Sequence, residues 1–581
     1  MAVGLAAFAA YVWAATPTAY PLDSAELASA AFGLGVAHPP GEETTLLFAK
    51  LFTLLPLGSV AFKVALSQAV AGALAAMLVF VLVLDTAQTM AIVVESTGEK
   101  TRAILAAAAA LAFAYAPGVV IVSNRAEVYA VQTALSLAAV WLALRAYASQ
   151  DARPALVSAL LIGLGIANHS LVAGLVGLGA VVAALPLLVR SSARLRLLSL
   201  SVLAFALGLL VHAYLPLRTA ALFAASDGGS NNVLWGDART WHGFWWVASA
   251  QTFADKAAVV HGNASPWDLP FLPIEELDKV FALLAPAGLY FLLRRRQSRL
   301  HGVALLVGAS GSLAAALVGG LDPANPDIRG YLGPAIALIA VLSGTAVAVG
   351  VAIFRLRQMR TLMAVVLLFG SLTRFPPSTK YPSLRHAEAA DAQVRGLLSD
   401  LPVRAALFTQ HFETGFLVGY QRGVEGARPD VAWGHLAFAG GPGYAERLAK
   451  AAPELSPVVD AYRRQQGAGA ALAALDESRP VRMEPDGVTP VAVRRTLAPA
   501  GALWGPTSSA SALAVEPLPA WALAEAKQDR QVRGYLAWLN FIDASWSCEL
   551  GFFERARERF AELAKLVPED ERFLQLQKSC R

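Results

Sequence analysis

The feature that most constrains the fold of this chain is a series of apolar runs suited to crossing a membrane. A helix of roughly 20 apolar residues spans about 30 Å of hydrocarbon. Only 15% of the 581 residues are charged and 56% are hydrophobic, whereas soluble domains carry about 25% charged residues. We therefore predict an α-helical polytopic membrane protein with about eleven transmembrane helices. They lie near residues 1–16, 60–84, 103–120, 128–145, 155–170, 172–189, 197–216, 279–293, 302–320, 334–353 and 359–372.

The basic residues between these runs predict the orientation of the chain. Every second connection is basic, and basic connections stay in the cytoplasm. These connections hold Lys100, Arg102, Arg145, Arg153, Arg190, Arg194, Arg196, Arg294, Arg295, Arg296, Arg299, Arg355, Arg357 and Arg360. We expect the segments 17–59, 218–278 and 321–333, together with the tail after 373, to lie outside the cytoplasm, on the periplasmic side of an inner membrane. The short run Thr44–Pro56 is expected to form an amphipathic helix at the interface.

Composition divides the chain into three predicted parts. A transmembrane domain is expected over residues 1–372, an α/β domain over 373–518 and a helical segment over 519–581. In the α/β part, Ala405–Thr409 and Asp430–Trp433 are predicted strands on either side of a helix from His411 to Tyr420.

The last segment resembles the second helix of a tetratricopeptide hairpin, with Gly551–Ala556, Phe560 and Pro568 at matching positions. A two-helix cap and a peptide-binding role both remain open. Cys548 and Cys580 lie in this segment, and their pairing remains open, although an oxidising compartment permits it. No His or Cys cluster has the spacing of metal ligands, so we expect no metal site.

Two carboxylates and a histidine stand in the first outward connection. Asp23 and Glu26 occur in Tyr20-Pro-Leu-Asp-Ser-Ala-Glu26, and His38 occurs in Gly35-Val-Ala-His-Pro-Pro-Gly41. Ionisable groups at a membrane face are costly to desolvate and typical of functional sites. Other polar residues share the outward side of the predicted topology: Asn124, Arg125, Glu127, Tyr129, Asn168, His169, Tyr214, Arg218, Asn325, Asp327, Arg329 and Tyr331. We expect them to line one outward-facing cavity.

Sugar transfer from a polyprenyl-phosphate carrier would use such a cavity. Asp23 suits the general base that takes a proton from the acceptor hydroxyl, with Glu26 orienting the acceptor. Arg218 and Arg329, with His38, suit the cations that neutralise the departing phosphate. The remaining candidate substrate-binding residues are Glu127, Tyr129, His169, Asp327 and Tyr331.

A purely structural role is also open to each of these residues. Asp23 suits the N-cap of a helix beginning at Ser24, with Glu26 at the capping-box position. His38 suits a rigid turn and His169 suits core packing. Glu127 suits an ion pair with Arg125, Arg218 suits snorkelling at the interface, and Arg329 suits a loop salt bridge with Asp327. Four tryptophans suit an aromatic belt at the interface as well as a sugar platform: Trp235, Trp241, Trp245 and Trp246.

Several blocks occur together in the order of one known family. They are Asp23-Ser-Ala-Glu26, His38-Pro-Pro-Gly41, Ala126-Glu-Val-Tyr-Ala130, Asn168-His169, Trp235-Gly-Asp237, Phe244-Trp-Trp246, Asn325-Pro-Asp-Ile-Arg-Gly-Tyr331, Tyr420-Gln421 and Arg428-Pro-Asp-Val431. The chain resembles a family of polytopic membrane glycosyltransferases, formerly a domain of unknown function, whose animal members are protein O-mannosyltransferases. The resemblance implies a GT-C fold with a catalytic carboxylate in the first outer loop. The chain departs from the pattern at Ala25, where the family has Gly, and at Glu42-Glu43.

These observations predict an inverting integral-membrane glycosyltransferase. The expected partners are a polyprenyl-phosphate sugar donor, with mannose as the sugar that the resemblance suggests, membrane lipid, and an exported protein acceptor modified on Ser or Thr. A cell-wall glycan or lipid acceptor and a non-enzymatic transporter remain open as well. The scattered basic residues are not typical of nucleic-acid binding, and no cofactor is expected.

Overall fold

The computed structural model describes residues 1–225, 227, 232–256, 265–320, 325–375, 383–507 and 517–580. Up to residue 375 the described chain is helical. Its α-helices are α1 (Ala2–Ala14), α2 (Ser24–Gly33), α3 (Glu43–Thr53), α4 (Val60–Gln88), α5 (Ala91–Ser96), α6 (Glu99–Ala114), α7 (Pro117–Ser123), α8 (Tyr129–Ser149), α9 (Arg153–Arg190), α10 (Arg194–Leu209), α11 (Tyr214–Ala224), α12 (Trp241–Ala248), α13 (Leu272–Glu276), α14 (Lys279–Ala282), α15 (Ala285–Arg294), α16 (Arg299–Val318), α17 (Asp327–Tyr331), α18 (Gly333–Ile353) and α19 (Arg357–Leu372).

Six helical segments within the described ranges are long and apolar enough to cross a membrane: α4, α8, α9, α10 with α11, α16 and α18. A seventh arises if α6 and α7, which meet at a bend of 69°, form one broken span. The protein is therefore an integral membrane protein. The count of about eleven stays a prediction, because α1, α15 and α19 have 13, 10 and 16 residues and a helix rises only about 1.5 Å per residue.

The helix α9 consists of two antiparallel legs rather than one rod. His169 has φ −148° and ψ 89°, which interrupts the helix. Ala155 shares a packed cluster with Leu187, and the side chain of Ile162 faces Gly177. The two separate runs predicted on either side of residue 171 are therefore confirmed, and their turn places Asn168 and His169 at one end of the bundle.

The helix α3 covers the run that we predicted to lie at the membrane interface. Its buried side includes Leu46 and Ala49, whereas the side chains of Leu47 and Leu51 are exposed. An exposed leucine row on a short helix matches an interfacial position.

The tail folds around a five-stranded sheet. Its strands are β1 (Ala406–Thr409), β2 (Ala432–His435), β3 (Val481–Met483), β4 (Leu497–Ala500) and β5 (Leu503–Pro506), in the order β2-β1-β3-β5-β4. The strand β1 pairs in parallel with β2 and β3, and β5 pairs antiparallel with β3 and β4. The first two predicted strands and the helix between them are confirmed by β1, β2 and α21 (Phe412–Gly423).

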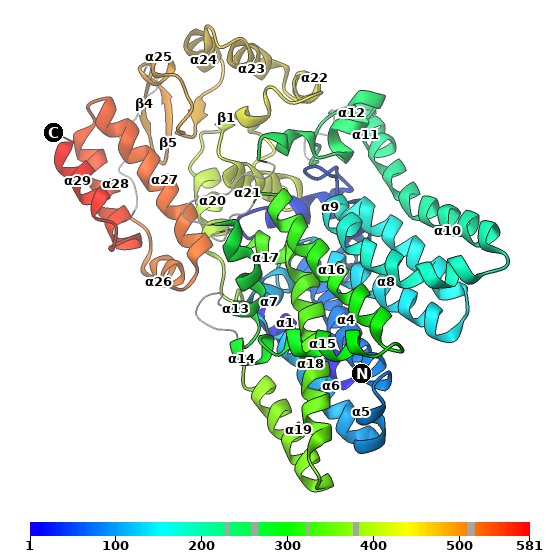
Figure 1. Cartoon of the computed structure of the whole chain (residues 1–581). Coiled ribbons are helices and arrows are strands. Elements are labelled where there is room, and N and C mark those ends of the chain that lie inside the picture. Colours follow the sequence, from blue (N-terminus) through cyan, green and yellow to red (C-terminus); the bar gives the residue numbers. More distant parts are fainter. Residues whose placement is uncertain are drawn as a thin grey trace.

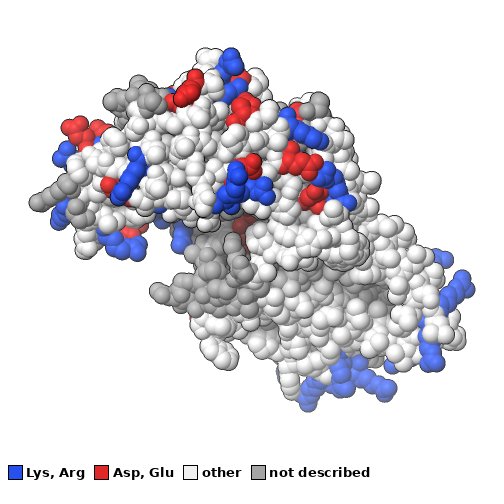
Figure 2. Space-filling view, turned by 90° about the horizontal axis from the view of Figure 1, so that it is seen from above, with Lys and Arg blue, Asp and Glu red and all other residues white. Residues whose placement is uncertain are grey.

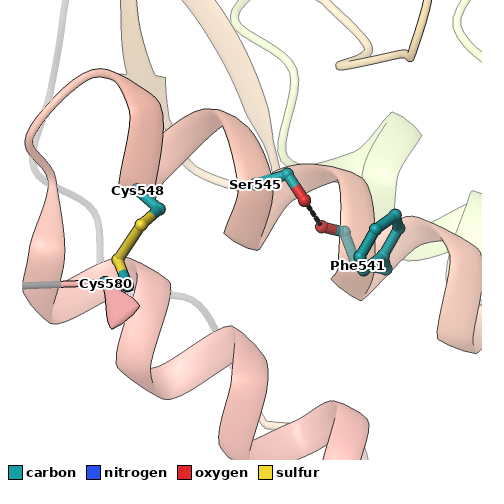
Figure 3. Close-up of a disulfide and its surroundings, with 4 residues drawn as sticks. All are labelled: Phe541, Ser545, Cys548 and Cys580. Carbon is teal, nitrogen blue, oxygen red and sulfur yellow. Dashed lines mark hydrogen bonds between the residues drawn. A yellow bond between two sulfur atoms is a disulfide. The ribbon is translucent and has the colours of Figure 1, made fainter. Parts of the chain in front are cut away.

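The other tail helices are α20 (Ala389–Ser399), α22 (Tyr444–Ala451), α23 (Ser456–Arg463), α24 (Ala468–Asp476), α25 (Val491–Arg494), α26 (Ala520–Gln528), α27 (Arg530–Glu549), α28 (Phe553–Leu566) and α29 (Glu571–Ser579). Cys548 of α27 and Cys580 after α29 form a disulfide (Figure 3). The pairing left open by the sequence is thus made, and it fixes the last helix to α27. The tetratricopeptide resemblance of this segment stays a prediction.

The tail covers one end of the helix bundle (Figure 1). Seen from above that end, acidic and basic side chains are interspersed over part of the surface, and wide areas carry no charge (Figure 2). The hydrogen bonds that join the tail to the membrane part include Leu384 N to Ala14 O, Ala61 N to Tyr420 Oη, Tyr20 Oη to Asp529 and Leu22 N to Glu413. The connection between α1 and α2 is therefore held from both sides, by the bundle and by the tail.

Candidate active site

The helix α2 sets the spacing of the two carboxylates in the first outer loop. It begins at Ser24, and the Asp23 side chain makes no capping hydrogen bond to it. The Glu26 carboxylate turns toward His38, so the two side chains do not form the capping box that the spacing allowed. After α2, Val36 forms a β-bridge with Leu234, which positions the segment that carries His38.

His38 is surrounded by carboxylates. Its Nδ1 lies 2.8 Å from Glu26 Oε2, and its backbone N donates to Glu26 Oε1 at 2.7 Å. On the other side of the ring, Nε2 lies 3.2 Å from Glu42 Oε1 and 3.8 Å from Asp23 Oδ2. The sequence predicted Asp23, Glu26 and His38 as one site, and the structure brings them together.

Burial and charge oppose each other in this cluster. Burial lowers the pKa of His38, but Glu42, Glu26 and Asp23 outweigh it and raise that pKa well above its usual value. Burial raises the pKa of Glu42 to about 7, although His38 partly compensates. The acids around His38 thus favour the positively charged form of its ring.

The exposure of the two predicted catalytic carboxylates differs. The Asp23 side chain is 38% exposed, whereas that of Glu26 is fully buried. Only Asp23 of this pair is open to an incoming acceptor. Glu26, with both oxygens occupied by His38, is placed to orient the ring instead of the acceptor.

A second buried charge group lies beside the first. The Arg125 guanidinium binds Glu127 Oε1 at 2.8 Å and Asp327 Oδ1 at 2.5 Å, and it donates to Ser24 Oγ at 3.1 Å. The structural role considered for Glu127, an ion pair with Arg125, is therefore the observed arrangement. Because Ser24 adjoins Asp23, Arg125 ties the start of α2 to α17 and to the segment before α8.

Three aromatic rings line the same end of the bundle. The ring centroids of Tyr129, His169 and Tyr331 lie 4.7 to 5.6 Å apart. A Cβ on Gly330 would come within 2.1 Å of the Tyr129 ring, so only glycine permits this packing. Asn168 accepts hydrogen bonds from Thr45 and donates to Gln132, which joins the turn of α9 to α3 and α8.

The two arginines predicted to hold phosphate have other partners. Arg218 donates to Leu34 O at 2.7 Å and to Gly33 O at 3.2 Å, at the carboxyl end of α2. Arg329 lies 3.2 Å from Glu276 and is buried. It pairs with Glu276 instead of Asp327, which binds Arg125. A phosphate role for the two arginines stays a prediction.

Trp235 belongs to the contact with the tail. Its ring packs against Phe412 and Phe438, at centroid distances of 6.0 and 4.7 Å, and it is only 9% exposed. Trp241 and Trp245 are 75% and 49% exposed, as a membrane-interface belt requires. Trp235 therefore differs from Trp241 and Trp245 in its surroundings, and the interfacial belt stays a prediction.

Sequence reasoning gave no chemical role to Glu42, Arg125 or Glu413. Glu42 stood out only as a departure from the family pattern, and Arg125 only as a polar residue of the outward side and a partner for Glu127. Glu413 lies almost 400 positions after Leu22, so no local pattern signals their contact. For Glu42 and Arg125, the available sequence signal was their position next to motif residues.

Comparisons with known proteins relate the first part of this chain to one family. Residues 23–195 match the family described as the protein O-mannosyl-transferase TMEM260 N-terminal domain. The mouse protein O-mannosyl-transferase TMEM260 is 54% identical over 59 residues, which are 10% of this chain and 8% of that protein. The match to this curated relative thus spans under a tenth of its length.

Solved structures extend the likeness in fold to most of the chain. The crystal structures of ArnT from Cupriavidus metallidurans, bound to undecaprenyl phosphate and in the apo state, each superpose with a TM-score of 0.50 at 14% sequence identity. Each covers 84% of this chain and 92% of the ArnT chain. The predicted recognition is therefore confirmed: the chain resembles the TMEM260 family of membrane O-mannosyltransferases over residues 23–195 and has a GT-C fold.

Proposed function

We propose that this protein is an inverting glycosyltransferase of the membrane, which moves a sugar from a polyprenyl-phosphate carrier to a Ser or Thr hydroxyl of an exported protein. One observation carries the proposal. Asp23 is the exposed carboxylate of a buried acid–histidine cluster, and it lies within the segment that matches the O-mannosyl-transferase family. The polyprenyl carrier is supported by the undecaprenyl phosphate of the ArnT structure.

The chemistry follows from the exposure of Asp23. A hydroxyl is a poor nucleophile until a positioned base accepts its proton. As the acceptor oxygen bonds to the anomeric carbon, the bond from that carbon to the phosphate oxygen breaks. The proton passes to Asp23, and the polyprenyl phosphate leaves with the electron pair of the broken bond. Attack opposite the leaving group inverts the anomeric centre.

Loss of the gene is expected to remove hexose from exported proteins. Mass spectrometry of these proteins, with and without the gene, should show a hexose mass on Ser or Thr only when the gene is present. Complementation with the wild-type gene should restore it. A change confined to lipid-linked glycans or cell-wall glycans would assign a different acceptor, and unchanged glycosylation throughout would contradict the enzyme proposal.

The proposed sidedness has its own test. A reporter enzyme fused after Arg374 is expected to lie outside the cytoplasm, and one fused after Arg296 is expected to lie inside. The reason is that basic connections are retained in the cytoplasm. Each position should carry a matched pair of reporters, one active on each side of the membrane. The reverse pattern at either position would contradict the predicted topology, in which Asp23 faces polyprenyl-linked donors outside the cytoplasm.

A further inference from the structure

The Asp23 cluster contains more acids than cations. Among the described residues, Asp23, Glu26, Glu42, Glu127 and Asp327 interact electrostatically with one another, and His38 and Arg125 are their basic partners. A phosphate entering such a site is repelled unless a further positive charge is present. The arginines at 218 and 329 are bonded elsewhere, so they do not supply it in this arrangement.

The atoms around the His38 ring have the geometry of a cation site. Two of the side chains, Asp23 and His38, belong with Glu26 to a group whose ligand atoms lie within 4.8 Å of one another, and Glu42 adjoins the same ring. Ligands held about 2.1 Å from one octahedral ion lie about 3.0 Å apart. The separation of 3.2 Å between His38 Nε2 and Glu42 Oε1 is close to this value, and the separation of 3.8 Å to Asp23 needs only a small approach.

The other ring nitrogen of His38, Nδ1, has the kind of partner that is usual in metal sites. A metal-ligating histidine usually donates its second N–H to a carboxylate, which fixes the ring orientation. His38 Nδ1 makes this bond with Glu26 at 2.8 Å. The arrangement leaves Nε2 directed at Asp23 and Glu42.

An unpartnered oxygen gives an independent indication. The Glu42 side chain is 2% exposed, and its Oε2 is buried without a hydrogen-bond partner among the described residues. Leaving a buried carboxylate oxygen unsatisfied costs free energy. A cation beside the His38 ring that Glu42 binds through both of its oxygens would supply the missing partner.

We propose that Asp23, Glu42 and His38 Nε2 bind one divalent cation, and that Glu26 positions the histidine. Carboxylates suit hard cations and imidazole suits transition metals, so Mn²⁺ matches the mixed set. This revises our expectation of no metal site, which considered only His and Cys spacing. The role of the ion rests on the proposed function: it neutralises the departing phosphate, while Asp23 gives one oxygen to the ion and keeps the other for the proton.

Mn²⁺ binding can be measured without any sugar transfer. The full-length protein is purified in nanodiscs, stripped with EDTA and titrated with Mn²⁺ while the free ion is followed by electron paramagnetic resonance. We expect one tight site per chain, with a nitrogen coupling from His38 that His38→Ala removes. Glu42→Gln and Asp23→Asn are expected to weaken binding by at least about 10-fold, and Glu26→Gln by about 10- to 100-fold.

Glu43→Gln is the matched control, because Glu43 adjoins Glu42 but binds His212 at 3.0 Å. It should bind Mn²⁺ like the wild type, and circular dichroism should confirm that all variants are folded. Equal binding by the wild type and Glu42→Gln, or binding without nitrogen coupling, would overturn the proposal. If the protein binds Mn²⁺ but transfers no sugar, the metal site stands and the proposed function is rejected. If it transfers sugar but binds no Mn²⁺, the proposed function stands and the metal site is rejected.

Discussion

Asp23→Asn is expected to lower the rate of sugar transfer by about 10²–10⁴-fold, the range for loss of a positioned acid–base group. Asparagine keeps the size of the side chain but does not accept the proton of an attacking hydroxyl. The measurement is the single-turnover rate of transfer from a polyprenyl-phosphate sugar to an acceptor peptide. Donor binding should change little, because the loss arises in the transition state.

Two comparisons separate the base from a metal ligand. The assay is run at saturating Mn²⁺, so that weaker ion binding alone is compensated. Full rescue of Asp23→Asn by excess Mn²⁺ would contradict a role as base. Asp400→Asn, which changes an exposed aspartate at the end of α20, should transfer sugar at the wild-type rate.

Arg125→Ala is expected to destabilise the fold by about 3–5 kcal/mol, because it leaves Glu127 and Asp327 buried without their cation. Both carboxylates bind this guanidinium in the structure. Thermal unfolding of the protein in nanodiscs, followed by tryptophan fluorescence, measures the effect. Arg239→Ala removes two partly exposed ion pairs, with Asp237 and Glu446, and should cost at most about 1 kcal/mol.

A variant that lacks all three buried charges tests whether unpaired charge causes the loss of stability. Arg125→Met combined with Glu127→Gln and Asp327→Asn removes the buried charges together, so most of the lost stability should return. If Arg125→Ala unfolds at the wild-type temperature, the ion pairs contribute nothing to the fold. If the variant that lacks all three charges stays as unstable as Arg125→Ala, packing of the arginine stem is the cause.

Local patterns predicted the parts of this protein that depend on neighbouring residues. Apolar runs predicted α4, α8, α16 and α18, and the polar pair Asn168-His169 marked the turn of α9. The spacing of strand and helix residues predicted β1, α21 and β2. The pair Asp23 and Glu26 with His38 was predicted as a site because all three stand in one short connection.

Local sequence patterns did not predict the contacts between distant segments. Arg218 lies within α11, and the carbonyls of Gly33 and Leu34 at the end of α2 accept hydrogen bonds from its guanidinium. Arg329 pairs with Glu276, whose short helix α13 gives no sequence signal. The sequence marks Glu42 only as a departure from the family pattern, and the fold places it beside His38.

The hydrogen bonds from the Leu22 amide to Glu413 and from Tyr20 to Asp529 limit how this protein can be recombined with its relatives. A chimera that exchanges the tail at residue 383 replaces one partner of each bond and leaves the other behind. Exchange of the tail between relatives without loss of these contacts therefore requires that the loop from Tyr20 to Asp23 be transplanted together with it. The smallest segment pair that can be exchanged as a unit thus comes from both ends of the chain.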